Sequence, residues 1–405
     1  MKWTKAAIPA LLIHVSIGTV YCWSTTKEQI ASQIGMSQFA VGWAFSLAIF
    51  FLGMSAAFSG RFVERDIHKS SLLACICFST GMIGTGVVVK YATGVPALLG
   101  IYIFYGVIMG IGLGVGYLTP VKTLMLWFGD QKGLATGISI MGFGLAKALA
   151  TPIMEILQNN IGVSNMLIVL GVIYFVLMYI GHLLLEKPKD WVEPIIRSND
   201  NILSIFCDKQ FMGIWIMFFI NIHCGLSIIS YEKQILNTAF ESSTMLPVIV
   251  AVVPSLTAAC NALGRIGYST LSDNFSQRNR IYKIIFGSSI VLSMVVYISG
   301  AITNAYNICL ATIVVGFLFV INGGYGGGFS TLPALLSERF GMRKISSIHG
   351  LALSAWAVAG LTGNNMSEIV LRHTGNYQMV IFIGAALYML AFGICAVVVG
   401  NKGEN

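Results

Sequence analysis

Three basic side chains lie within apolar stretches of the sequence, where charges are rare: Arg265, Lys122 and Lys147. Arg265 comes eight residues before Asp273, which marks the expected end of its stretch. In a helix, eight residues rise about 12 Å. An arginine at that depth in a membrane costs several kcal/mol unless it faces water, protein or an anion. Because a guanidinium matches a carboxylate bidentately, Arg265 is the first candidate for an anion clamp; the alternative is a structural arginine bonded to backbone carbonyls.

The two lysines extend this basic character. Lys122 comes eight residues before Asp130, at a depth similar to that of Arg265. Lys147 comes 15 residues after the basic end of its stretch, roughly 22 Å along a helix. Either lysine could instead snorkel to the headgroups. The acids Glu155 and Glu368 fall near the outer ends of their stretches. They could be proton sites or outer-gate residues; the alternative is that they are interfacial acids at helix ends. A zone with up to three cations and no resident acid predicts a small anionic substrate.

The composition indicates that these residues are carried by membrane helices. Of 405 residues, 56% are hydrophobic and 10% are charged, whereas a soluble domain carries roughly 25% charged residues. The pattern predicts an all-α membrane protein with twelve transmembrane helices in two bundles: six helices in residues 1–185, a cytoplasmic linker at 186–210 and six helices in 211–405. The expected spans lie near 6–26, 39–60, 71–91, 97–128, 134–157, 164–185, 211–231, 244–270, 281–302, 306–336, 346–371 and 378–400.

Basic residues between these spans predict the orientation. Seventeen of the 24 Lys and Arg residues fall on one side, four on the other and three within spans. Both termini are therefore expected in the cytoplasm, with the protein in the cytoplasmic (inner) membrane. The same bias accounts for the net charge of +8, so nucleic-acid binding need not be invoked.

The two halves repeat each other. Gly116-Tyr117-Leu118-Thr119 is followed 212 residues later by Gly328-Phe329-Ser330-Thr331. Phe329 is thus the repeat mate of Tyr117, and Ala334 that of Lys122. Parallel repeats of this kind place a substrate site between the halves, near the midplane of the membrane.

No cofactor chemistry is evident in the sequence. The eight cysteines lie mostly in apolar stretches and have no zinc or redox spacing, so we expect them to be packing residues. No metal-ligand set, nucleophile constellation or phosphate loop occurs. We therefore expect no cofactor and no enzyme activity. His14 and His223 occupy corresponding spans and could titrate in the cavity; the alternative is a hydrogen bond to a neighbouring helix.

The segment from Gly60 to Lys69, with Glu64 and Arg65 at its centre, resembles the signature between the second and third helices of the major facilitator superfamily. Asp273 is the equivalent acid of the second half. The resemblance implies that these acids and bases cap helix ends and hold one closed arrangement of a gate.

Further motifs resemble the oxalate/formate antiporter family within that superfamily: Tyr21-Cys22-Trp23-Ser24, Gly116 to Val121, Trp127-Phe128, Lys132 to Gly137, Met141 to Gly144, Leu185 to Trp191 and Asn261 to Arg265. The resemblance implies a substrate-binding arginine in the eighth helix, at Arg265. The family's second cation, a lysine in the eleventh helix, corresponds to Trp356, which favours a monoanion over oxalate. Tyr21, Tyr117 and Phe143 occupy family cavity positions, with ordinary core packing or lipid contact as the alternative.

These features predict a monomeric secondary transporter for a small anionic carboxylate, embedded in the lipid bilayer. Proton-coupled monocarboxylate carriers, which this sequence also resembles, place an acid four residues before the arginine. That residue is Asn261 here, which favours exchange; a proton symporter is the alternative. A membrane sensor, the alternative from another class, would need a signalling domain that the short linker and tail do not supply.

Overall fold

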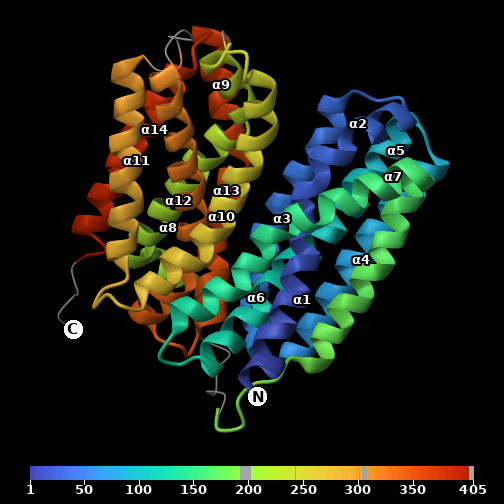
Figure 1. The fold of residues 1–405 in the computed structure, drawn as a ribbon. Coiled ribbons are helices and arrows are strands. Elements are labelled where there is room, and N and C mark those ends of the chain that lie inside the picture. Colours follow the sequence, from blue (N-terminus) through green and yellow to red (C-terminus); the bar gives the residue numbers. More distant parts are fainter. Residues whose placement is uncertain (192–201, 242, 301, 303–307, 401–405) are drawn as a thin grey trace. The chain divides into compact units, whose positions relative to one another are not determined.

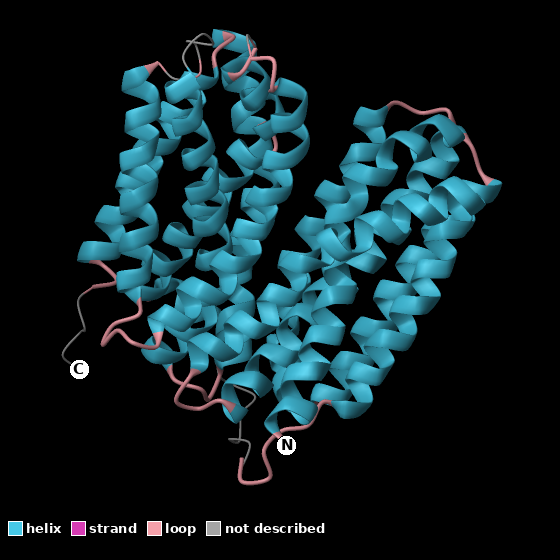
Figure 2. Cartoon of the chain, in the orientation of Figure 1, coloured by secondary structure: helices cyan, strands magenta, loops and turns pink. Residues whose placement is uncertain are grey.

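The computed structural model describes residues 1–191, 202–241, 243–300, 302 and 308–400. Within that part of the chain the regular elements are helices, without a strand (Figure 2). This confirms the predicted all-α class. Among the described residues, eleven helical stretches are long and apolar enough to cross a membrane: Trp3–Ile34, Gln38–Arg65, Ile67–Tyr91, Gly94–Trp127, Lys132–Leu184, Lys209–Ile229, Leu246–Ser272, Asn279–Ser299, Thr312–Phe340, Ile345–Thr374 and Tyr377–Val397.

The longest stretch, α7 (Lys132–Leu184), contains two of the predicted spans. Its 53 residues would extend about 80 Å as a straight helix, against about 30 Å of hydrocarbon in a bilayer. The backbone leaves the helical conformation at Gly162, with φ +79° and ψ 158°. Positive φ is readily adopted only by glycine. The chain therefore reverses between the predicted spans 134–157 and 164–185, and eleven stretches supply twelve spans.

Two other stretches are built from several segments. The first consists of a π-helical turn Trp3–Ala7, α1 (Ile8–Ile17), a 3₁₀ segment Gly18–Cys22 and α2 (Trp23–Ile34). The fourth consists of α5 (Gly94–Ile101), a π-helical segment Tyr102–Met109 and α6 (Gly110–Trp127). Irregular turns inside helices often occur at functional positions. The 3₁₀ segment carries Tyr21, one of the predicted site residues.

The chain divides into two compact units. The first unit comprises Met1–Ile202 together with Leu336–Ala357, and the second comprises Leu203–Leu335 together with Val358–Asn405. The helix α13 (Ile345–Thr374) therefore contributes its beginning to the first unit and its end to the second. The predicted bundle boundaries, which follow chain order alone, stay a prediction.

Within the first unit, α7 packs against α1 and α4 (Ile67–Tyr91), and α3 (Gln38–Arg65) packs against α6. Within the second, α14 (Tyr377–Val397) packs against α8 (Lys209–Ile229) and α11 (Asn279–Ser299), as Figure 1 shows. The short helix α9 (Glu232–Ala239), which follows α8, is amphipathic and was not predicted from the apolar stretches.

One close helix contact in the second unit bears directly on the candidate site. A Cβ atom at Gly326 of α12 (Ile308–Phe340) would lie 2.1 Å from the carbonyl oxygen of Asn261 in α10 (Leu246–Ser272). Only glycine allows that separation, and small residues serve this purpose between membrane helices. The contact fixes the turn of α10 that carries Asn261 and, one turn later, Arg265.

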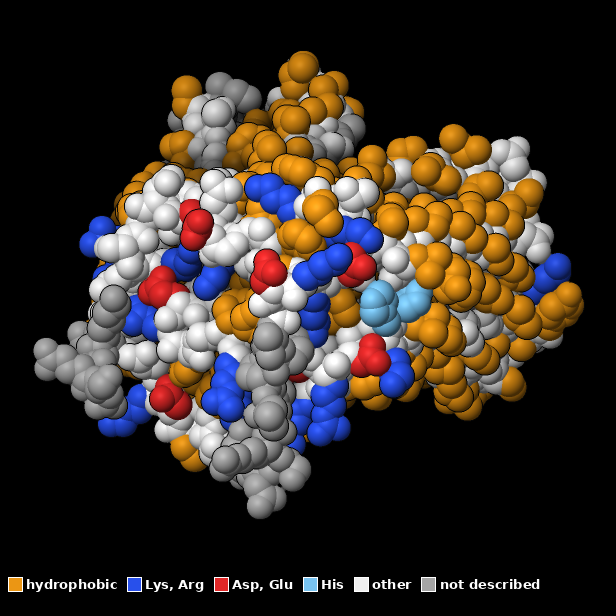
Figure 3. Space-filling view, turned by 90° about the horizontal axis from the view of Figure 1, so that it is seen from below, with side chains coloured by type: hydrophobic (Ala, Val, Ile, Leu, Met, Phe, Trp, Pro, Cys, Tyr) orange, Lys and Arg blue, Asp and Glu red, His pale blue; other side chains and the backbone are white. Residues whose placement is uncertain are grey.

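Charged side chains gather at one end of the helices, as Figure 3 shows in a view from below. Apolar side chains cover the right-hand side of the same view. Several of these charges form ion pairs at helix ends: Lys5 with Glu186 at 2.9 Å, Lys69 with Asp66 at 3.3 Å and Arg278 with Asp273 at 2.6 Å. Hydrogen bonds from the backbone of Lys69 and His68 lower the pKa of Asp66, which caps the start of α4. An apolar flank with a charged end is the surface expected of a membrane protein.

Candidate functional site

Four predicted site residues lie together in the first unit: Tyr117 of α6, Phe143 of α7, Trp356 of α13 and Tyr21. We call them the aromatic cluster. The Tyr117 ring centroid is 5.6 Å from that of Phe143 and 5.6 Å from that of Trp356, and Phe143 is 5.9 Å from Trp356. Tyr21 contacts Phe143 at 5.4 Å. The rings meet edge to face, an arrangement that adds to their burial energy. Four separate elements thus contribute to one cluster of packed rings, three of which are buried.

Two histidines adjoin this cluster. His14 of α1 lies 5.3 Å from the Tyr117 ring, and its Nδ1 is hydrogen-bonded to the Ser139 hydroxyl at 2.8 Å. His349 of α13 lies 6.0 Å from the same ring. His14 is one of the residues singled out from the sequence, whereas His349 was not predicted. Its position seven residues before Trp356, two helical turns away on the same face, is the signal that could have found it.

Arg265, in the second unit, is buried, with 2% of its surface exposed. Its Nε donates a hydrogen bond to Asn261 Oδ1 at 3.0 Å. Its guanidinium carbon lies 5.4 Å from the centre of the Phe329 ring, within the range of a cation–π interaction. The structure thus brings together two predicted site residues, Arg265 and Phe329. The Asn261 amide supplies an acceptor without a negative charge.

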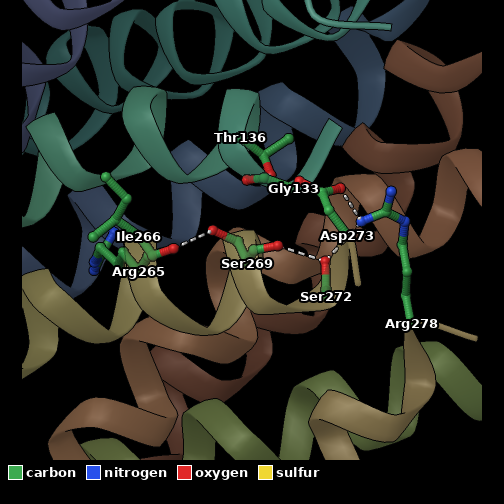
Figure 4. Close-up of polar contacts among 8 residues, drawn as sticks. All are labelled: Gly133, Thr136, Arg265, Ile266, Ser269, Ser272, Asp273 and Arg278. Carbon is green, nitrogen blue, oxygen red and sulfur yellow. Dashed lines mark hydrogen bonds and ion pairs between the residues drawn. The ribbon is translucent and has the colours of Figure 1, made fainter. Parts of the chain in front are cut away.

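A chain of hydrogen bonds runs from the Arg265 turn to the end of α10 (Figure 4). The Ser269 hydroxyl donates to the Arg265 carbonyl, and the Ser272 hydroxyl donates to the Ser269 carbonyl. Arg278 then donates from Nη1 to the Ser272 hydroxyl at 2.7 Å and pairs with Asp273 at 2.6 Å. Asp273 is therefore held by a basic residue of its own half, and its role as a gate residue stays a prediction.

Glu64 lies at the end of α3, with 1% of its surface exposed. Its carboxylate accepts hydrogen bonds from the backbone N–H and the hydroxyl of Ser347, each at 3.2 Å. Ser347 lies in the first turn of α13, where the helix dipole favours an anion. The charge of Lys122 also acts on Glu64. The carboxylate therefore joins the end of one helix to the start of another.

This arrangement corrects one expectation from the sequence. The deep cations were predicted to have no acid nearby, but buried Lys122 interacts electrostatically with buried Glu64. Its ammonium group also lies 5.7 Å from the ring of Trp191. The acid was missed because it belongs to a different helix, 58 residues earlier in the chain. Lys122 and Glu64 are thus two buried residues of opposite charge within the first unit that interact electrostatically.

Several other predicted site residues lie away from the aromatic cluster and from Arg265. Lys147 is exposed on α7, one turn beyond Phe143, and Arg65 is exposed beside Glu64. Glu155 is exposed as well, and Glu368 pairs with Arg372 on its own helix.

His223 behaves as the alternative interpretation predicts. Its Nδ1 is hydrogen-bonded to the Thr362 hydroxyl at 2.9 Å, and its Nε2 lies 3.1 Å from the Met366 sulfur. Both partners lie on α13, a neighbouring helix, in the part that belongs to the same unit.

Comparisons with known proteins place this fold. The sequence matches the Major Facilitator Superfamily over residues 10–364. It is 22% identical to the oxalate:formate antiporter of Oxalobacter formigenes, covering 100% of this chain and 93% of that protein. It is 21% identical to apicoplast pyruvate carrier 1 of Toxoplasma gondii, covering 97% and 88% of the two chains.

A solved structure has a similar fold. A bacterial homologue of the iron transporter ferroportin aligns with a TM-score of 0.77 at 12% identity, covering 99% of this chain and 100% of that one. At such low identity the likeness concerns the fold. The family match, by contrast, extends over most of the sequence and includes Glu64, Tyr117 and Arg265. The chain therefore belongs to the Major Facilitator Superfamily, and it is a membrane transporter rather than an enzyme.

Proposed function

We propose that this protein carries a small organic anion across the cytoplasmic membrane by exchange. The substrate class is a monocarboxylate such as formate, pyruvate or lactate, or oxalate. The observation that carries the proposal is Arg265, a buried guanidinium in a membrane-spanning helix that lies against the Phe329 ring. Burying such a charge is costly, and membrane proteins accept the cost mainly at functional sites.

The chemistry around Arg265 fits a carboxylate. Its Nε is oriented by the Asn261 amide, and the forked geometry of a guanidinium suits the two oxygens of a carboxylate. Two relatives, one named as an oxalate:formate antiporter and the other as a pyruvate carrier, support the same substrate class.

A counterflow assay tests this function. Purified protein is reconstituted in vesicles loaded with one unlabelled acid, and uptake of labelled formate, pyruvate, lactate or oxalate is followed from outside. We expect uptake that depends on the internal acid and is insensitive to an imposed proton gradient. Uptake that needs a proton gradient and proceeds without internal anion would favour the alternative, a proton-coupled symporter. Failure with all four acids would refute the carboxylate class.

Asn261→Asp tests the basis for exchange. The new carboxylate would lie where the amide now accepts a hydrogen bond from Arg265 at 3.0 Å. When ionised, it would compete with the substrate for the guanidinium; when protonated, it would not. We therefore expect transport to become dependent on pH, stronger in acid and weaker in alkali. The measurement is counterflow between about pH 5 and about pH 8, the direction following from the titration of a carboxyl group.

The matched control for that substitution is Asn365→Asp. Asn365 is exposed on α13, and its amide donates a hydrogen bond within its own helix, to the Leu361 carbonyl. The same chemical change there is expected to leave the pH profile unaltered. Equal pH dependence in both variants would mean that Asn261 has no special relation to the substrate.

The orientation in the membrane follows from the charge bias of the loops. We expect the C-terminus to lie in the cytoplasm. A fluorescent protein that does not fold after export should therefore be active when it is fused after Asn405. A reporter that requires export should be inactive at the same position. The reverse pattern would overturn the predicted location of both termini and the assignment of the inner face.

A further inference from the structure

Two histidines that the proposed function does not use lie against each other at one end of the first unit. His68 belongs to the first turn of α4 and is exposed, and His182 belongs to the last turn of α7 and is half-buried. Their ring centres are 5.4 Å apart, with the ring planes at 87°. Histidine side chains are visible at the surface of the charged end in Figure 3. Because imidazole is the most common protein ligand of transition metals, the pair is a candidate metal site.

The hydroxyl of Ser71 determines which nitrogen of His182 carries the proton. This hydroxyl donates to the His68 carbonyl at 3.0 Å, so its single proton is already used. The Nδ1 of His182 lies 2.7 Å from the same oxygen and must therefore be the donor. In a neutral imidazole protonated at Nδ1, the lone pair lies on Nε2. Metal-binding histidines typically donate their other ring nitrogen in this way, which orients the ring and makes it a better ligand.

The separation of the two rings suits a shared ion. Two imidazoles bound to one tetrahedral zinc ion at about 2.0–2.1 Å have ring centres about 5 Å apart, close to the observed 5.4 Å. Because His68 is exposed, its side chain is free to turn a nitrogen toward the Nε2 of His182. Among the described residues, no group of three or more His, Cys, Asp and Glu side chains could hold a metal. The two imidazoles would therefore be the protein ligands, and water would fill the other positions.

Two carboxylates lie near the histidines. Asp66 acts electrostatically on His182, and Glu186 interacts in the same way with His68. Each carboxylate pairs with a lysine, at 3.3 Å and 2.9 Å respectively. Lys189, which also acts on Glu186, is exposed to solvent. The nearest lysines are thus already paired with acids, and a bound cation would not face a buried positive charge.

We propose that His68 and His182 bind a divalent transition-metal cation such as zinc. The ion would join the start of α4 to the end of α7, two helices that pack against each other within the first unit. The inference is independent of the proposed carboxylate transport, because binding of the ion can be measured without any transport.

Titration calorimetry of the purified protein with zinc chloride tests this site. The protein carries no polyhistidine tag, and the exposed Cys207 and Cys309 are replaced with serine in every sample, so that neither a tag nor an exposed thiol contributes. We expect saturable binding of one zinc ion that magnesium does not displace, since magnesium prefers oxygen ligands. His68→Asn and His182→Asn should each weaken binding by more than about tenfold, because each removes one of the two ligands.

Two variants separate the ligands from the local structure. His182→Asn keeps an amide that can donate a hydrogen bond to Ser71, so it removes the ligand nitrogen and little else. Ser71→Ala leaves both imidazoles in place but removes the group that orients His182, and it should weaken zinc binding about tenfold or more. Melting temperatures measured without zinc show that each variant is folded.

His373→Asn is the matched control. This histidine is exposed near the end of α13, where its Nδ1 lies 2.8 Å from the Ile369 carbonyl oxygen of its own helix. The variant should bind zinc as the wild type does, and an equal loss of binding there would overturn the proposal. A wild type without saturable binding at millimolar zinc, or unchanged binding in His68→Asn and His182→Asn, would overturn it as well.

Discussion

Replacing Arg265 with alanine is expected to abolish counterflow of every carboxylate that the wild type transports. The substitution removes the buried guanidinium, with its hydrogen bond to Asn261 and its contact with Phe329. Hydrogen bonds to a charged group contribute roughly 1.5–3 kcal/mol each, so losing a pair weakens substrate binding by about a hundredfold or more. The measurement is initial counterflow at matched amounts of reconstituted protein, together with substrate-dependent thermal stabilisation.

Two further variants separate charge from geometry. Arg265→Lys keeps the positive charge but loses the planar fork, so transport should also be severely reduced. Lys147→Ala is the control, since this lysine is exposed whereas Arg265 is buried; it should cost much less. Normal transport by Arg265→Ala combined with an inactive Lys147→Ala would place the carboxylate clamp in the first unit instead.

Removing either charge of the Glu64–Lys122 pair is expected to destabilise the first unit. Both side chains are buried and interact electrostatically. Glu64→Gln leaves Lys122 without its acid, and Lys122→Met leaves Glu64 without its cation. Leaving a buried charge without an opposite charge nearby is destabilising. Each single variant should therefore show a lower melting temperature and a smaller folded yield in detergent.

The double variant, Glu64→Gln with Lys122→Met, provides the control for that prediction. It removes both charges, so neither side chain is left buried with an uncompensated charge, and stability should recover relative to either single variant. Additive losses in the double variant would show that the two charges act independently. The Glu64→Gln substitution also keeps an acceptor for Ser347, which limits the change to the charge.

Lys122 and Lys147 are expected to differ in how much each contributes to stability. Lys122→Met changes stability through Glu64, whereas exposed Lys147 carries its charge at the surface, so that its removal should leave stability nearly unchanged. In the sequence both residues are lysines inside apolar stretches and both are candidates for the site, at different expected depths. The depth of a residue along its helix can be counted from the sequence. Its partner on a neighbouring helix cannot be identified in that way.

The helical class, the approximate spans and the residues with unusual chemistry could all be predicted from the amino-acid sequence. Apolar stretches of span length leave few options, since only helices satisfy all their backbone hydrogen bonds within one segment. An arginine inside an apolar stretch, such as Arg265, can likewise be recognised from the sequence as costly to bury. The family assignment followed from motifs that include Glu64 and Tyr117, and the match over residues 10–364 confirmed it.

Which of these residues contact one another depends on how the helices pack, and the sequence did not predict it. The approach of Tyr117, Phe143 and Trp356 joins the consecutive helices α6 and α7 to α13, which lies far away in the chain. The acid beside Lys122 and the unpartnered Nε2 of His349, within the described residues, emerge in the same way. Side-chain partners across helices depend on how each helix is rotated about its axis, and packing sets that rotation. A hydropathy pattern with little difference between helix faces leaves it open.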